Sequence, residues 1–175
     1  HRPRNPEIYK APYVLFKKGL DCADYSIRAV YTESDFLYRE TINCIKGSEK
    51  DKKTLLNLCG LLNSSLFSYF NLMLGSSTGI EREQIFLEEL GNYPYVYNDE
   101  LVELVEKMQR EEWGKNRNEL QVALNQCVMR MYGLQDNYFV DYALSIQIPM
   151  LCGTYQETKC DAKSMKEYVS ILSKI

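Results

Sequence analysis

Two leucine-rich segments separated by a short polar break constrain the fold of this chain more than any other feature. Residues 55–62 carry an apolar side chain at every third or fourth position, and residues 66–74 repeat that spacing with aromatic side chains among the leucines. Such spacing places apolar side chains on one face of a helix. The break at residues 63–65 reads Asn-Ser-Ser, whose short polar side chains favour helix caps, and Gly75 tolerates the backbone of a helix end. The pattern predicts two consecutive amphipathic helices.

The sequence before these helices is typical of β-strands. Residues 12–16 form a short apolar run, residues 27–32 form a second, and residues 36–45 are rich in β-branched and aromatic side chains. Because successive side chains of a strand point to opposite faces, the third segment would present its polar side chains together. These side chains are Arg39, Thr41 and Asn43. This face is either simply solvated or turned towards DNA, where Arg and Asn form bidentate contacts with base edges.

The sequence after residue 97 is helical in pattern. Asn98 is a candidate N-cap for a helix that extends to about residue 113, and residues 118–132 form a second helix. The short connection between them favours an antiparallel hairpin. A further helix is expected from residue 161 or 164 onward. The expected fold class is therefore α+β, with a small, mainly antiparallel sheet packed with helices and a C-terminal helical hairpin.

Four short motifs occur in a specific order in the central part of the chain. They are Leu61-Leu62-Asn63-Ser64, the aromatic segment 67–70, Gly79-Ile80-Glu81-Arg82 and Pro94. In this order they resemble the C-terminal target-recognition (specificity) region of adenine-N6 DNA methyltransferases from restriction-modification systems of the type I or type IIG kind. The resemblance extends more loosely over residues 12–132. We expect an α+β target-recognition region at residues 1–97 and a helical region packed on it at residues 98–175. In the second region, a resemblance of the segment from Tyr132 to Leu144 to the helical end of the same family implies a helix at residues 136–146.

In that family a separate upstream domain methylates the base, with S-adenosylmethionine as its cofactor. The signatures of that domain are a glycine-rich cofactor loop and an Asn/Asp-Pro-Pro-aromatic tetrapeptide. Residues 5–8 (Asn-Pro-Glu-Ile) and 92–95 (Asn-Tyr-Pro-Tyr) do not complete the tetrapeptide. His1 is the only histidine, which argues against a histidine-based hydrolytic site and against a Cys/His metal site. We therefore expect no catalytic residue, no cofactor and no metal in this chain, which would not itself be an enzyme.

Charge is distributed unevenly along the 175 residues, whose net charge is −3. Residues 1–19 are basic, with Glu7 as their only acidic residue, and acidic side chains concentrate in residues 81–112. A basic end suits an anionic partner. The chain begins with His1 and carries neither a secretion signal nor an apolar run that would span a bilayer. We therefore expect a piece of a longer cytoplasmic protein that does not enter the membrane.

Ten residues are the candidates for DNA contact. They are Lys10, Lys17, Lys18, Arg28, Arg39, Asn43, Ser76, Ser77, Thr78 and Arg82. The lysines alternate with aromatic residues and would follow the phosphate backbone. The three hydroxyl residues would offer O–H and backbone N–H groups to phosphates, and an arginine would reach a guanine edge. Each group also has a structural explanation, since lysines flank strands, a polar loop can simply join two elements, and Arg82 can pair with a neighbouring glutamate.

The sequence thus predicts a chain that recognises a DNA target for an adenine-N6 methyltransferase. Its expected partners are double-stranded DNA, the catalytic methyltransferase domain of the same parent chain and restriction-modification subunits. The alternative, from another class, is a protein-interaction module whose C-terminal helices dock a restriction-modification subunit. A concave positive face on the sheet would favour DNA, whereas a large apolar patch on the helices would favour a protein partner.

Overall fold

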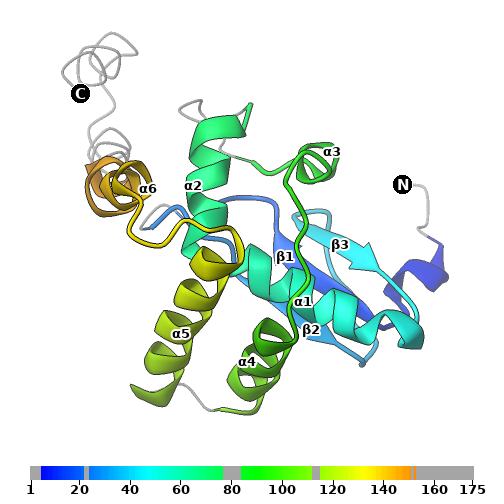
Figure 1. Ribbon diagram of the computed structural model, residues 1–175. Coiled ribbons are helices and arrows are strands. Elements are labelled where there is room, and N and C mark those ends of the chain that lie inside the picture. Colours follow the sequence, from blue (N-terminus) through cyan, green and yellow to red (C-terminus); the bar gives the residue numbers. More distant parts are fainter. Residues whose placement is uncertain (1–4, 22–23, 77–83, 112–114, 151, 153–175) are drawn as a thin grey trace, which may run out of the picture.

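The computed structural model describes residues 5–21, 24–76, 84–111, 115–150 and 152. These residues contain a three-stranded antiparallel sheet packed with helices, which confirms the predicted α+β class. The elements in chain order are η1 (Pro6–Tyr9), β1 (Tyr13–Lys17), β2 (Ala29–Thr32), β3 (Ile42–Lys46), η2 (Glu49–Asp51), α1 (Lys52–Leu62), α2 (Ser65–Leu74), α3 (Leu87–Leu90), α4 (Asp99–Arg110), α5 (Lys115–Met131), α6 (Tyr138–Tyr142) and the π-helix η3 (Ala143–Gln147). Figure 1 shows α1 lying across the sheet. None of the described helices is long and apolar enough to span a bilayer.

The sheet has one core face and one accessible face. β1 is the central strand, with β2 and β3 antiparallel on its two sides. Val14 and Phe16 of β1 are buried in the core shared with α1. Leu15 lies opposite Val30 of β2 and Cys44 of β3, so these three side chains share the other face. That face is only partly covered, because Leu15 is half-buried and Val30 is exposed.

The close contact between α1 and α4 depends on Gly60. A methyl group at Gly60 would lie 2.8 Å from the side chain of Leu101 and 2.9 Å from that of Val105. Both of these α4 residues are buried. On its other side α4 contacts α5, and the two helices run side by side (Figure 1), as expected for the predicted hairpin. Helix α1 is therefore enclosed between the sheet and α4.

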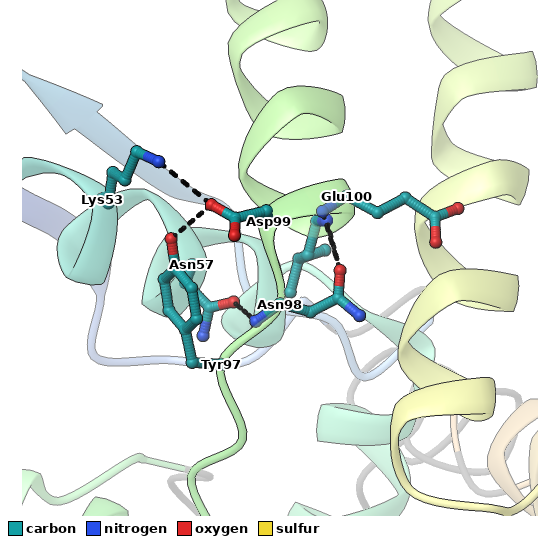
Figure 2. A network of polar contacts seen from close by, with 7 residues as sticks. Lys53, Asn57, Tyr97, Asn98, Asp99 and Glu100 are labelled. Carbon is teal, nitrogen blue, oxygen red and sulfur yellow. Dashed lines mark hydrogen bonds and ion pairs between the residues drawn. The ribbon is translucent and has the colours of Figure 1, made fainter.

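A buried asparagine fixes the start of α4 on α1. The fully buried Asn57 side chain donates to the carbonyl of Val96 at 2.9 Å and accepts from the N–H of Asn98 at 3.0 Å. Asn98 in turn is the N-cap of α4, as predicted, and accepts two backbone N–H groups of the first turn. Figure 2 shows the exposed Lys53–Asp99 ion pair beside this amide, with 3.1 Å between nitrogen and oxygen. The start of α4 is thus held by a buried amide as well as by a surface ion pair.

Side chains, rather than a further strand, close the outer edge of β2. The N–H of Ala29 donates to Oδ1 of Asn63 at 3.0 Å, and its carbonyl accepts from Nδ2 of Asn63 at 2.9 Å. The carbonyl of Tyr31 accepts from Nε2 of Gln109 at 2.8 Å, and the Tyr31 backbone also interacts with the thiol of Cys59. Unpaired backbone groups on an edge strand otherwise template pairing with another chain. The side chains of Asn63, Gln109 and Cys59 take the place of a fourth strand.

Several expectations from the sequence differ from the structure in length or type. The predicted strand 36–45 is a strand only as β3, because residues 36–41 form a loop that is tied to η1 and β1. Between residue 74 and residue 98, where no element was predicted, the structure contains the short α3. The predicted helix 136–146 begins at Tyr138 and changes to a π-helix at Ala143. The helix expected from residue 161 or 164 lies outside the described residues.

Candidate nucleic-acid interface

A groove of about 960 Å³ runs along β2. Its floor includes Leu15, Val30 and Ile42 from the accessible face of the sheet. One wall is formed by the end of β2 and by residues 33, 34 and 36–38 after it, and the other by side chains of α1, α4 and α5. The groove therefore brings together segments that are far apart in the sequence.

Cationic side chains outnumber carboxylates in this groove. The cations are Lys17, Arg28, Lys52, Arg110 and Arg117, and the carboxylates are Glu33 and Glu106. The whole chain has the opposite balance, with 21 Lys and Arg residues against 24 Asp and Glu residues. A concave surface lined by one sign of charge raises the local concentration of oppositely charged partners. The groove is thus suited to an anionic partner.

The two carboxylates are already paired within the groove. Glu33 lies 2.7 Å from the Lys52 ammonium, and Glu106 lies 3.6 Å from the Arg110 guanidinium. The hydrogen bond from Lys52 lowers the pKa of Glu33, whereas burial and the hydrogen bond from its own hydroxyl to Glu33 raise the pKa of Tyr31. Neither Glu33 nor Tyr31 therefore changes its charge near neutral pH. We expect ligand binding in the groove to depend on salt far more than on pH between about 6 and 8.

The remaining cations differ in how far their side chains are already engaged in ion pairs or hydrogen bonds. Lys17 is exposed, and no described side chain pairs with it. Arg28 makes only a long ion pair with Asp21, at 3.5 Å, and its side chain is largely exposed. Arg117 is more constrained, because it donates to the carbonyl of Met108 at 2.9 Å. Lys17 and Arg28 are therefore the two predicted DNA contacts that the structure brings into one groove.

A second groove of about 740 Å³ continues from the first around the edge of β2. Arg28, Val30, Gln109 and Arg117 line both grooves. Much of its polar lining is committed to the fold: Asn63 closes the β2 edge, and Gln121 donates to the Asn63 carbonyl at 2.9 Å. The two grooves form one trough, with Arg28 and Arg117 at the junction.

Three other predicted cations lie outside this trough. Lys10 forms an ion pair with Glu7 at 2.8 Å. The backbone of Lys18 bonds to Thr41 and Ile85, but its side chain is not part of the groove lining. Arg39 is exposed in the loop before β3. Lys18 and Arg39 each directly follow a residue of the groove lining, Lys17 and Tyr38 respectively, whereas Lys10 does not.

The proposed role of Asn43 requires a correction. Its side chain is 5% exposed and donates through Nδ2 to the carbonyl of Ile85 at 3.1 Å. The strand begins at Ile42 and not at Phe36, and Asn43 faces the interior. A buried amide that satisfies a backbone carbonyl is not available to a base edge. Asn43 is therefore a structural residue that joins β3 to the segment before α3.

The hydroxyl loop is described only at its first residue. Ser76 is exposed, and its backbone N–H donates to Oε1 of Glu89 at 3.1 Å. Hydrogen bonding by the Ser76 side chain, with a smaller contribution from its backbone N–H, lowers the pKa of Glu89. Ser77, Thr78 and Arg82 lie outside the described residues, so their contact with DNA stays a prediction.

Two features of the surface were missed by sequence reasoning. Lys52, Arg110 and Arg117 join the groove from three different helices, and no local pattern links them. A stripe of exposed apolar side chains also follows α6 and η3. Its members are Tyr138, Phe139, Tyr142, Ile146 and Met150, with Tyr138 stacked on Tyr142. Their spacing of about four residues was a usable signal for one exposed helical face.

Comparisons with known proteins add no assignment to this geometry. No model of a known protein family matches the chain, and no curated protein matches it. Within the part of the chain that the structure describes, no three His, Cys, Asp or Glu side chains gather as a metal site. The candidate site is accordingly defined by its shape, its charge and its apolar floor.

Proposed function

We propose that the groove along β2 binds double-stranded DNA and that the chain recognises a DNA target for an adenine-N6 methyltransferase of a restriction-modification system. The observation that carries this proposal is the gathering of five cationic side chains on one concave surface of a chain with net charge −3. The order of the central motifs, from Leu61 to Pro94, gives the proposal its enzyme class. Methyl transfer, with its S-adenosylmethionine, is assigned to a separate domain of a cytoplasmic parent protein.

The cationic side chains in and beside this groove suit two kinds of DNA contact, with phosphates and with base edges. Lys17 carries a point charge without a described ion-pair partner, so it suits a phosphate and contributes equally to all DNA sequences. Arg28 and Arg39 have planar guanidinium groups that are largely exposed. Such a group can bind O6 and N7 of guanine with two hydrogen bonds, which discriminates between bases. We assign positioning to Lys17 and candidate reading roles to Arg28, which lines the groove, and to Arg39, which lies just outside it.

The test is a titration of duplex DNA at several salt concentrations, followed by fluorescence anisotropy. Lys17→Ala should lower the slope of log affinity against log salt by about one, because one phosphate contact and its counterion are lost. Lys50→Ala is the matched control, since Lys50 is exposed in η2 and does not line the groove. Equal slopes for Lys17→Ala, Lys50→Ala and the unchanged chain would refute the assignment of this groove to DNA.

A second function is favoured by a separate observation, the apolar stripe on α6 and η3. Contiguous exposed aromatic side chains on a helix commonly mark a protein contact. The stripe would dock the catalytic domain of the parent or another restriction-modification subunit. Phe139→Ser should weaken co-sedimentation with that partner and leave DNA affinity unchanged, whereas Lys17→Ala should do the reverse. Loss of both activities in both variants would mean that the two surfaces are not separate.

A further inference from the structure

The loop before β3 presents two adjacent apolar side chains to solvent. Leu37 is 87% exposed and Phe36 is 53% exposed, and both border the cationic groove. Leu37 is the most exposed large hydrophobic side chain among the described residues. Single exposed apolar residues are ordinary on protein surfaces, whereas these two are adjacent and lie at the rim of a charged groove. We therefore ask what ligand the side chains of Phe36 and Leu37 could contact.

The backbone that carries these side chains is tightly held. The N–H of Phe36 donates to the hydroxyl of Tyr13 at 2.7 Å, and this buried tyrosine donates to the carbonyl of Ser34 at 3.1 Å. The carboxylate of Asp35 accepts the N–H of Ala11 at 2.8 Å, and the Tyr38 hydroxyl donates to the carbonyl of Ile8 at 2.9 Å. The loop is thus tied to η1 and β1 on both sides of Leu37. A surface that is already ordered loses little conformational entropy when it binds.

The surroundings of the pair indicate which partner it fits. Lys17 and Arg28 line the same groove, and the exposed Arg39 follows Leu37 by two residues. The partner must therefore be anionic on its outside and apolar where Leu37 and Phe36 reach it. Stacked bases flanked by phosphates have this arrangement, and several DNA-binding proteins insert apolar side chains between base steps. The charge complementarity favours duplex DNA over an apolar protein surface as the occupant.

We propose that Leu37, supported by Phe36, is a preformed wedge that inserts between two adjacent base pairs and unstacks them while the groove holds the phosphates. This inference rests on the proposed function and adds a deformation of the duplex to it. Sequence preference would then arise partly from how easily a base step opens, with pyrimidine–purine steps favoured. Leu37 itself forms no hydrogen bond with a base edge and reads no base directly.

The experiment uses the full chain and a duplex selected by that chain from a random-sequence library. 2-Aminopurine is substituted at each step of the selected duplex in turn, because its fluorescence rises when it is unstacked. The unchanged chain should raise the fluorescence at one step. Leu37→Ala should abolish the rise and weaken binding about tenfold, equivalent to about 1.4 kcal/mol, without a change in the salt slope. Leu37→Met should retain most of the rise, since it keeps an apolar side chain of similar size.

Two controls keep the outcomes distinct. Leu87→Ala removes a comparably apolar, exposed side chain from α3, outside the groove, and should leave fluorescence and affinity unchanged. Because Leu37 is exposed, its variants should unfold at the same temperature as the unchanged chain. Selection of no duplex at all would refute the proposed function, and the wedge with it. Selection of a duplex without a fluorescence rise at any step, or a rise that persists in Leu37→Ala, would refute the wedge alone.

Discussion

Replacement of Asn57 by alanine tests how α4 is held on α1. The side chain of Asn57 is fully buried, and it satisfies the carbonyl of Val96 and the N–H of Asn98. Loss of the partner of a buried polar group costs about 1–3 kcal/mol. Val96 and Asn98 are only half-buried, so we take about 1–1.5 kcal/mol for each. The better helix propensity of alanine offsets about 0.5 kcal/mol of this cost, so the free energy of unfolding should fall by about 2 kcal/mol.

Urea unfolding followed by circular dichroism at 222 nm measures this loss as a lower midpoint at an unchanged slope. Lys53→Ala is the matched control, because Lys53 belongs to the same network but pairs with Asp99 at the surface (Figure 2). Its effect should be much smaller, since exposed ion pairs contribute little. If Asn57→Ala and Lys53→Ala have the same midpoint, the buried amide does not hold α4 and the reasoning is wrong.

A companion variant, Asn57→Asp, adds a pH signature. At neutral pH its carboxylate still accepts the N–H of Asn98 but faces the carbonyl of Val96 without a proton to donate. Burial of that charge raises the pKa of the new carboxyl in the folded state. The folded state therefore binds a proton more tightly than the unfolded state, and stability rises as pH falls towards the unfolded pKa of about 4. Stability of this variant that is unchanged between pH 7 and pH 5 would contradict the assigned hydrogen bonds.

Two further predictions concern neighbouring residues of α1. Gly60→Ala should lower the free energy of unfolding in urea by about 1 kcal/mol, because overpacking against Leu101 and Val105 exceeds the gain in helix propensity. Gly91→Ala is the control and should be close to neutral, since the added methyl group would lie 3.5 Å from its nearest neighbour, the carbonyl oxygen of Glu88. Burial raises the pKa of Cys59 to about 12, so alkylation at pH 8 and peptide mapping should find it unmodified until the chain unfolds. Because the unfolded thiol ionises near 9.0, stability should also fall as pH rises from 9 towards 12. Rapid alkylation of Cys59 in the folded chain would mean that its helix opens readily.

Local signals were sufficient for much of the helical architecture. Asn98 was predicted as an N-cap and is one, with its side chain bonded to the first turn of α4. Ser64, in the predicted break between the first two helices, caps α2 by accepting the N–H of Phe67. Gly133 follows α5 with a φ of +65°, in the left-handed region that glycine tolerates. In each case the determining residues lie within one helical turn of the boundary, so a short window contains the information.

The features of the fold and of the candidate site that were not predicted from the sequence depend on contacts between residues far apart in the chain. Asn43 was placed on a polar outer face by alternation, but its partner is the carbonyl of Ile85, 42 residues away. The loop before β3 was predicted as strand because of its aromatic side chains, whereas its one tyrosine, Tyr38, donates its hydroxyl to the carbonyl of Ile8 in η1. The groove itself was not predicted, and of its cations only Lys17 and Arg28 were predicted as DNA contacts, since the others come from separate helices. Burial and charge clustering depend on the packing of whole elements, which no local pattern contains.

The closure of β2 by side chains imposes an order on synthesis of the chain. When Tyr31 has left the ribosome, 78 further residues must be added before Gln109 exists to bond to its carbonyl. At about 5–20 residues per second this interval lasts about 4–16 s. Asn63 arrives earlier, 34 residues after Ala29, so the edge is closed in two stages. During the interval the nascent chain exposes a partly unprotected strand edge, and slower translation before residue 109 should increase its capture by chaperones that bind extended segments.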